Sequence, residues 1–193
     1  MGSAMQKEQY LYDDVYVISQ FLSPDECRKY IAIAEEVGFV DAPITTANGP
    51  VMRKDVRNNL RVMIDDPQEA ALLWESAKKW AVSPFRGREA IGLNERFRYY
   101  RYEPGQSFAP HYDGAYEREN GERSEFTFLI YLNDDFEGGA TTFFKPGRFH
   151  VVPQTGDLLI FRHPQLHEGA IVESGVKYVL RSDVMYSKYG LED

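Results

Sequence analysis

The sequence predicts a mainly β protein of the α+β class, in which antiparallel strands form a sandwich or barrel and two helices cover one outer sheet. Two observations carry this prediction: two capped helix patterns precede Asn94, and seven short strand-like runs separated by turns follow it. The length of 193 residues suits one domain with a sizeable core, and 43% hydrophobic residues exclude a disordered chain.

The first predicted elements are a strand and a helix. Residues 14–21 alternate apolar and polar side chains, which predicts a strand. Ser23-Pro-Asp-Glu26 then combines a cap serine, a proline at the first helical position and a glutamate three residues after the serine, which is a capping box. We expect this helix to end at Gly38, because glycine commonly terminates helices.

A long loop and a second helix are expected next. Residues 39–58 are rich in Pro, Gly, Asn and Thr, so we expect a loop, with a short strand near residues 59–64. Loops of this length are often functional. A cap at Asp66 opens a helix whose apolar residues keep helical spacing, and this spacing predicts that Trp74 and Trp80 lie in the core.

The second half of the chain is predicted to consist of consecutive strands. Gly- and Pro-containing pairs such as Pro104-Gly105 and Thr155-Gly156 separate them, as in antiparallel sheets. We expect one domain over residues 1–193, with 1–93 as helical support and loop and 94–186 as the β core. The predicted strands are 96–102, 107–113, 125–132, 141–144, 148–152, 157–161 and 176–186.

Composition excludes several classes of protein. The net charge of -8 and the pI near 5.1 disfavour nucleic-acid binding, which relies on clustered Lys and Arg. The single cysteine, Cys27, cannot form an internal disulfide and is expected to be an inert structural thiol. The first residues lack the apolar region of a signal peptide, and no apolar run has the length of a membrane span. We therefore expect a cytoplasmic protein.

A candidate metal site ends the segment from Tyr102 to Asp113. In a strand, residues two apart point to the same face, so His111 and Asp113 would direct an imidazole and a carboxylate at one point. His167 is the best candidate for a third ligand, and His163 competes with it. Two histidines and one carboxylate leave open positions, as in non-haem Fe(II) oxygenases, although such a site also accepts Mn, Co, Ni or Zn.

Three other residues complete the sequence reading of this region. Lys177 follows His167 by ten residues at the start of an apolar strand, and a buried cation there is costly unless it meets an anion. Arg181 shares the strand face of Lys177 and is an alternative partner for that anion, because a guanidinium binds carboxylates in bidentate fashion. His150, on a strand of its own, is expected to be a structural histidine.

Residues 94–186 resemble the 2-oxoglutarate- and Fe(II)-dependent oxygenases, and within them the prolyl 4-hydroxylase-like branch. Each motif is short, but their common order and spacing are specific to this family. The first motif is Tyr102, Gly105, His111 and Asp113; the second is Gly138, Gly139, Thr141 and Phe143; the third is Pro153, Gly156, Asp157, Phe161, His167 and Lys177.

The resemblance implies a double-stranded β-helix, or jelly roll, and a dioxygenase that uses Fe(II), 2-oxoglutarate and O2. The implied reaction hydroxylates a protein side chain or a small metabolite and releases succinate and CO2. The resemblance assigns His111, Asp113 and His167 as iron ligands, with no further catalytic residue. It assigns Lys177 to the C5 carboxylate of 2-oxoglutarate, with hydrogen bonds from Tyr102 and Thr141, and its spacing favours His167 over His163 and Lys177 over Arg181.

Candidate substrate residues lie on the strand before the first motif and in the long loop. If Tyr102 faces the cofactor, alternation puts Arg96, Arg98 and Tyr100 on its side, a basic surface that suits an anionic or hydrogen-bonding substrate. The loop 41–66 is hypothesised to border the site. Within it, Arg57, Asn59 and Arg61 are candidate contacts, and a solvated or structural face is the alternative for them.

Two other functions compete with the hydroxylase. One is a non-catalytic jelly-roll module that binds a metal or a 2-oxo acid, against which stands the complete ligand set including Asp113. The other is a nucleic-acid dealkylase, against which stands the net charge of -8. The basic strand 96–102 and the final strand 179–186 depart from collagen prolyl hydroxylases, so prolyl specificity, the substrate and the oligomeric state stay open.

Overall fold

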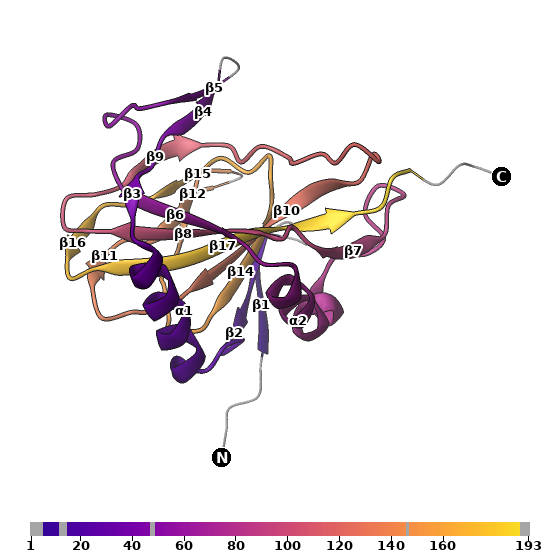
Figure 1. The fold of residues 1–193 in the computed structure, drawn as a ribbon, viewed down its shortest axis with the longest axis horizontal. Helices are drawn as coiled ribbons and strands as arrows, with labels where there is room; N and C mark the ends of the chain where they lie inside the picture. The colour runs from indigo at the N-terminus through magenta and orange to yellow at the C-terminus, as the bar shows by residue number, and fades with distance from the viewer. Residues whose placement is uncertain (1–5, 12–14, 47–48, 146, 190–193) are drawn as a thin grey trace.

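The computed structural model describes residues 6–11, 15–46, 49–145 and 147–189. Its largest unit is a nine-stranded antiparallel sheet with the order β1-β2-β14-β10-β17-β8-β6-β3, in which β7 also pairs with β17 (Figure 1). These strands are β1 (Gln6–Leu11), β2 (Val15–Ser19), β14 (Leu158–Arg162), β10 (Arg123–Tyr131), β17 (Lys177–Tyr186), β8 (Arg96–Tyr102), β6 (Leu60–Asp65), β3 (Val40–Asp41) and β7 (Ala90–Leu93).

A smaller sheet lies against the large one and carries two of the candidate ligands. It has four antiparallel strands in the order β13-β12-β15-β9. They are β13 (Phe149–Val151), β12 (Thr141–Phe143), β15 (His167–Gly169) and β9 (Phe108–His111). Two further pairs join β11 (Glu137–Gly138) to β16 (Val172–Ser174) and β4 (Ile44–Thr46) to β5 (Gly49–Val51). The predicted mainly β class and jelly-roll architecture are confirmed.

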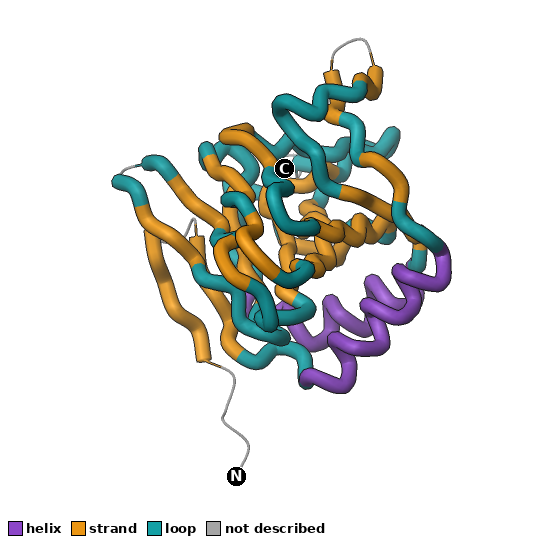
Figure 2. Tube along the Cα trace, turned by 90° about the vertical axis from the view of Figure 1, so that its left-hand side faces the viewer, coloured by secondary structure: helices purple, strands orange, loops and turns teal. Residues whose placement is uncertain are grey.

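The two predicted helices are present, and both cover the same side of the large sheet (Figure 2). Helix α1 (Pro24–Val37) begins with the expected capping box, in which the Glu26 amide donates to Ser23 Oγ at 3.3 Å and the Ser23 amide donates to the Glu26 carboxylate at 2.8 Å. Helix α2 (Pro67–Ala77) begins where the Glu69 amide donates to Asp66 Oδ1 at 2.9 Å, and a 3₁₀ turn (Lys78–Trp80) follows it.

The large sheet separates two hydrophobic clusters. The cluster under the helices contains Phe97, Phe126, Phe128 and Leu180. The cluster between the two sheets contains other residues of the same strands. Strand alternation explains this division, because successive side chains point to opposite faces. The second cluster is Val15, Val17, Tyr100, Tyr102, Tyr131, Phe143, Val151, Leu159, Phe161, Val172 and Val179.

The structure corrects four expectations. The first half of the chain is more than helical support, because β1, β2, β3 and β6 extend the large sheet. The expected loop 39–58 contains the short strands β3, β4 and β5, whose pairing with neighbours overrides their turn-rich composition. Trp74 and Trp80 are only half-buried at the edge of the helix-side cluster, because helix spacing fixes a direction and not a depth.

The fourth correction concerns Asp113. Strand β9 ends at His111, so Asp113 lies in the following loop and not on the predicted strand. In the pairing register His111 is opposite His167, the first residue of β15, so the ladder of β9 and β15 ends at this pair.

Two global features agree with the sequence reading. Cys27 is a buried free thiol, and burial raises its pKa to about 11, which keeps it unreactive. Within the described residues, neither helix is long and apolar enough to cross a membrane.

Candidate metal centre and cofactor pocket

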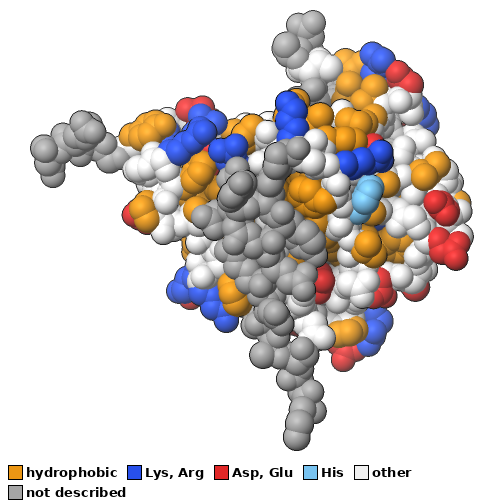
Figure 3. Space-filling view, turned by 180° about the vertical axis from the view of Figure 1, so that it is seen from behind, with side chains coloured by type: hydrophobic (Ala, Val, Ile, Leu, Met, Phe, Trp, Pro, Cys, Tyr) orange, Lys and Arg blue, Asp and Glu red, His pale blue; other side chains and the backbone are white. Residues whose placement is uncertain are grey.

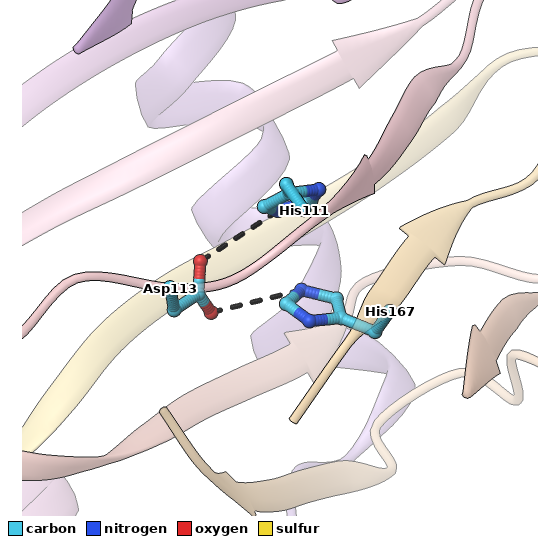
Figure 4. A group of neighbouring side chains, drawn as sticks. All are labelled: His111, Asp113 and His167. Carbon is cyan, nitrogen blue, oxygen red and sulfur yellow. Dashed lines mark ion pairs between the residues drawn. The ribbon is translucent and has the colours of Figure 1, made fainter. Parts of the chain in front are cut away.

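Three side chains from two strands and a loop converge on one point (Figure 4). His111 ends β9, His167 begins β15, and the Asp113 carboxylate lies between them. Nε2 of His111 is 3.7 Å from Asp113 Oδ1, and Nε2 of His167 is 3.7 Å from Asp113 Oδ2. One ligand atom from each residue lies within 4.8 Å of the other two, so a single metal ion can reach all three.

Backbone carbonyls fix the tautomer of both histidines. Nδ1 of His111 is 2.8 Å from the Ala109 carbonyl, and Nδ1 of His167 is 2.9 Å from the Gln165 carbonyl. Since a carbonyl only accepts, each Nδ1 carries the proton and each Nε2 presents a lone pair toward Asp113. Burial lowers the pKa of His167 to about 4, so this ring is neutral at pH 7, as a metal ligand must be.

The Asp113 carboxylate is held in place from both sides. Arg181 Nη1 lies 2.9 Å from Oδ1, and Thr127 Oγ1 donates to Oδ2 at 2.6 Å. Burial would raise the pKa of Asp113, but the Arg181 guanidinium holds it well below its usual range. The carboxylate is therefore ionised, and its remaining lone pairs face the two Nε2 atoms.

His163, the rival third ligand, lies behind the site. Its ring nitrogens contact Ser124 Oγ at 2.8 Å and Thr127 Oγ1 at 3.2 Å. It does not belong to the cluster of potential ligands. Because Thr127 also bonds Asp113, the structure places His163 in a hydrogen-bonded chain behind the carboxylate. His150, as expected, bonds a neighbouring side chain, Thr142 Oγ1, at 2.9 Å.

Lys177 is a buried cation without a protein anion. Its side chain is 3% exposed, and Nζ donates to the Gly139 carbonyl at 2.6 Å. No carboxylate of a described residue pairs with it, and burial alone lowers its pKa to about 7. Gly139 is at φ +64°, and a Cβ on it would lie 3.1 Å from Lys177 Cδ, so glycine makes room for this lysine.

Arg181 differs from Lys177 because its guanidinium already pairs with protein carboxylates. Its guanidinium contacts Asp113 at 2.9 Å and Asp183 at 3.1 Å. Burial opposes the charge, but these two carboxylates raise the pKa of Arg181 above its ordinary value. A bound anion can therefore pair with Lys177, whereas Arg181 is already paired with Asp113 and Asp183.

The other predicted cofactor residues surround Lys177. Its Nζ lies 5.2 Å from the Tyr102 ring centre and 5.6 Å from that of Tyr131. The Tyr131 hydroxyl lies 2.7 Å from Thr141 Oγ1. The cavity between them also reaches the ligand cluster. Its lining is Tyr100, Tyr102, Phe108, His111, Asp113, Leu129, Thr141, His167, Glu168, Gly169, Lys177, Val179 and Arg181.

Of the predicted substrate residues, Tyr100 belongs to the cavity lining, and the others lie outside it. Tyr100 lines the cavity, and Arg61 lies directly opposite it on β6. Arg98 points along the same face but bonds Asp183 at 3.1 Å. Asn59 is fully buried and accepts a hydrogen bond from Arg57 at 2.7 Å, so it contacts another predicted residue and not the cavity. Arg96 pairs with Asp65 at the surface.

Sequence reasoning missed Thr127, Tyr131 and the ring of Phe108. Phe108 stacks on His111 with a centroid distance of 3.5 Å. Thr127 and Tyr131 belong to β10, where Phe126, Phe128 and Ile130 face the helices. Alternation on that strand was the available signal, because it puts residues 127, 129 and 131 on the face of the ligands.

The residues present fit a metal ion and an anionic cosubstrate. Two imidazoles and one carboxylate offer a two-histidine, one-carboxylate set that leaves further coordination positions open. In the same cavity, Lys177 supplies a charged donor that lacks an anion. Fe(II), 2-oxoglutarate and O2, the predicted cofactor and cosubstrates, match this combination.

Comparison with known proteins agrees with the geometry. Residues 97–182 match the model of the 2OG-Fe(II) oxygenase superfamily. Prolyl 4-hydroxylase 1 of Arabidopsis thaliana is 28% identical over 188 residues, which cover 85% of this chain and 66% of that protein. The chain thus spans somewhat less than two thirds of this relative's length.

Solved structures share the fold. A viral collagen prolyl hydroxylase from Paramecium Bursaria Chlorella virus-1, in its 2OG complex, has a TM-score of 0.64 at 22% identity and covers 89% of this chain and 95% of its own. A prolyl hydroxylase from Trichoplax adhaerens, in complex with a peptide fragment, has a TM-score of 0.70 at 16% identity. It covers 90% of this chain and 84% of its own. The chain is therefore similar to the 2OG-Fe(II) oxygenase superfamily over residues 97–182 and, over most of its length, to prolyl 4-hydroxylases.

Proposed function

We propose that this protein is an Fe(II)- and 2-oxoglutarate-dependent hydroxylase that acts on a protein side chain or a small molecule. One observation carries the proposal: three convergent ligands share a cavity with a buried lysine that has no protein anion. In this proposal His111, Asp113 and His167 hold the metal, and Lys177 pairs with the C5 carboxylate of 2-oxoglutarate. The cytoplasmic location expected from the sequence stays a prediction.

The residues around the ligands have defined tasks in this proposal. The Ala109 and Gln165 carbonyls keep both Nε2 atoms unprotonated, and Thr127 with Arg181 orients the carboxylate. Tyr102 and Thr141 flank the Lys177 end of the cavity, where the cosubstrate would lie. When bound, Fe(II) with 2-oxoglutarate and O2 supplies the oxidising chemistry that yields succinate, CO2 and a hydroxylated product.

The two competing functions have less support. Against a non-catalytic module stands the complete set of three ligands, including Asp113, beside a cavity. A nucleic-acid dealkylase needs a basic face, whereas blue Lys and Arg side chains are interspersed with acidic and hydrophobic ones on the face seen in Figure 3.

The test is succinate formation from 2-oxoglutarate in air with added Fe(II). Asp113→Ala should reduce it by more than about 100-fold, because loss of a ligand exceeds the loss that follows from removing a ligand's support. Lys177→Ala should raise the half-saturating 2-oxoglutarate concentration by at least about 30-fold, as expected for a buried charged pair. Calorimetric binding of 2-oxoglutarate to the Mn(II)-loaded protein under nitrogen gives a second measurement.

Glu75→Ala and Lys78→Ala are matched controls, because these residues form an exposed ion pair at 2.6 Å at the end of helix α2. Both should behave as the parent protein. Absence of succinate together with absence of 2-oxoglutarate binding in the parent would refute the proposed function.

A further inference from the structure

An excess of arginine surrounds Tyr100 at the edge of the ligand cavity. Arg57, Arg61, Arg98 and Arg181 all lie near this tyrosine. Two buried carboxylates, Asp113 and Asp183, face them, and these pair with Arg98 and Arg181 only. The local excess of positive charge is notable in a chain with a net charge of -8.

Arg57 is the residue of this group with the most unusual surroundings. Arg57 is 5% exposed, and its guanidinium carbon lies 4.5 Å from the ring centres of both Tyr100 and Phe108. Phe108 in turn stacks on the ligand His111 at 3.5 Å. The guanidinium is therefore one aromatic ring away from a metal ligand.

Neighbouring residues hold Arg57 in this position. Nε donates to Asn59 Oδ1 at 2.7 Å, and Asn59 Nδ2 donates to the Leu60 carbonyl at 2.8 Å. Asn59 itself is fully buried, so this orientation is fixed by packing. One terminal nitrogen, Nη2 of Arg57, is buried and has no hydrogen-bond partner among the described residues.

Arg61 completes the positive surface. It lies opposite Tyr100 in the pairing of β6 with β8, and it is half-buried. No carboxylate of a described residue pairs with Arg61 or with Arg57. Burial lowers the pKa of Arg61, Tyr100 opposes this change, and Arg57 and Arg98 lower the pKa further.

An unpaired, buried guanidinium donor costs free energy unless a ligand satisfies it. Carboxylates match a guanidinium best, because two parallel hydrogen bonds form between them. The cosubstrate assigned to Lys177 does not explain these donors, because Lys177 lies opposite Tyr102 on β17 and lines the cavity, whereas neither Arg57 nor Arg61 belongs to that lining. The remaining molecule in the proposed reaction is the substrate.

We infer that Arg57 and Arg61, with Tyr100 between them, bind a carboxylate of the substrate and thereby position a nearby carbon at the metal. This inference rests on the proposed function and names the substrate class as carboxylate-bearing molecules. The carboxylate has two possible sources: a free acid such as an amino acid, or an acidic side chain or C-terminus of a peptide. Neutral prolyl peptides would leave Arg57 without its partner.

The experiment uses the Fe(II)-loaded protein with saturating 2-oxoglutarate. The twenty free amino acids and a set of small hydroxy acids and dicarboxylic acids are compared with their primary amides. A second arm uses short peptides with an acidic residue or a free C-terminus and their amidated, uncharged counterparts. Succinate formation is one readout, and the thermal stability of the Mn(II)- and 2-oxoglutarate-loaded protein under nitrogen is the other.

We expect at least one carboxylate to accelerate succinate formation and raise thermal stability, and its amide to do so at least about tenfold more weakly. Arg57→Gln should raise the half-saturating concentration of that carboxylate at least about tenfold, and far more than that of 2-oxoglutarate. Arg57→Lys should restore little, because lysine cannot reproduce the stacked, bidentate fork. Arg28→Gln, which removes an exposed guanidinium on α1, should change neither.

Several outcomes would overturn the inference. The first is that amides accelerate succinate formation as well as the corresponding acids do. The second is that no acid in either arm changes succinate formation or thermal stability while 2-oxoglutarate is turned over. The third is that Arg57→Gln leaves the half-saturating concentration of the active carboxylate unchanged. Failure of the proposed function is a different result, because then the parent protein neither binds nor consumes 2-oxoglutarate.

Discussion

The two faces of the large sheet carry different kinds of side chain. On β17, Leu180 and Val184 point to the helices and join a cluster of hydrophobic side chains. Their neighbours Lys177, Arg181 and Asp183 point to the smaller sheet; Lys177 and Asp183 are buried charges, and the Arg181 side chain is 13% exposed. One strand therefore contributes burial of apolar area on one face and a charged site on the other.

The contrast shows where stability and function are separated. Apolar burial stabilises the fold roughly in proportion to area, at about 25 cal/mol per Å². Buried charges are neutral or unfavourable unless they are fully paired. The helix-side face is thus the stabilising one, and the site-side face holds groups whose partners arrive with the metal, the cosubstrate and the substrate.

The sharpest test compares Arg181→Met with Lys177→Met, two cations on the same face of β17. Arg181→Met should destabilise the metal-free protein by about 3–5 kcal/mol, because it leaves the buried carboxylate of Asp113 without its arginine and removes one of the two arginines that pair with Asp183. Lys177→Met should leave the stability of the metal-free protein unchanged or raise it, because an unpaired buried cation is itself unfavourable. Denaturant unfolding monitored by tryptophan fluorescence measures both.

The ligand-loaded protein provides the control for this pair. Saturating Mn(II) and 2-oxoglutarate should raise the unfolding midpoint of the parent but should add less to that of Lys177→Met than to the parent. Equal destabilisation of the metal-free protein by the two substitutions would show that Lys177 has a protein partner and that the two cations do not differ.

The next prediction concerns pH and the same lysine. Burial lowers the pKa of Lys177 from 10.5 to about 7, so above pH 7 the free folded protein loses this proton while the unfolded chain keeps it. Lys177 therefore destabilises the fold fully below pH 7 and progressively less up to pH 10.5. Binding of 2-oxoglutarate needs the charged form, so its dissociation constant should rise up to about tenfold per pH unit above pH 7.

Titrations of 2-oxoglutarate into the protein at saturating Mn(II), from about pH 6 to about pH 9, measure this dependence. Lys177→Arg is the control, because a guanidinium keeps its charge over that range and should give a flatter profile. A parent profile as flat as that of the arginine variant would mean that Lys177 stays charged without an anion.

Sequence patterns predicted the positions of the helices and long strands better than the burial of individual side chains or the presence of short strands. The caps at Ser23 and Asp66 lie where local hydrogen bonds alone decide the helix start. Trp74 was expected in the core and is half-buried, because the distance to the sheet depends on tertiary packing. Strand β3 was missed because its partner, β6, lies beyond the β4–β5 hairpin, and β4 and β5 were missed because they are short and lie in a turn-rich segment.

The site shows the same limit. His111, Asp113 and His167 were chosen by spacing, and the structure brings them together, although Asp113 lies in a loop. Spacing could not reveal that Arg181 is occupied by carboxylates and Lys177 is not, because that difference depends on contacts across strands. Nor could it reveal Arg57, whose stacking on Tyr100 depends on the path of the loop.

The smallest expected effect concerns the support behind the metal ligands. Thr127→Val keeps the shape of the side chain but removes the hydrogen bond to Asp113 Oδ2 and the contact with His163. Loss of such support should weaken Mn(II) binding by about 10-fold, because the carboxylate then samples other orientations. Thr142→Val is the matched control, since Thr142 is equally buried and bonds His150 away from the ligand cluster. If both variants weakened Mn(II) binding alike, the effect would reflect general loosening of the buried polar groups between the sheets, whereas a loss confined to Thr127→Val would show that the site-side face of β10 determines ligand orientation.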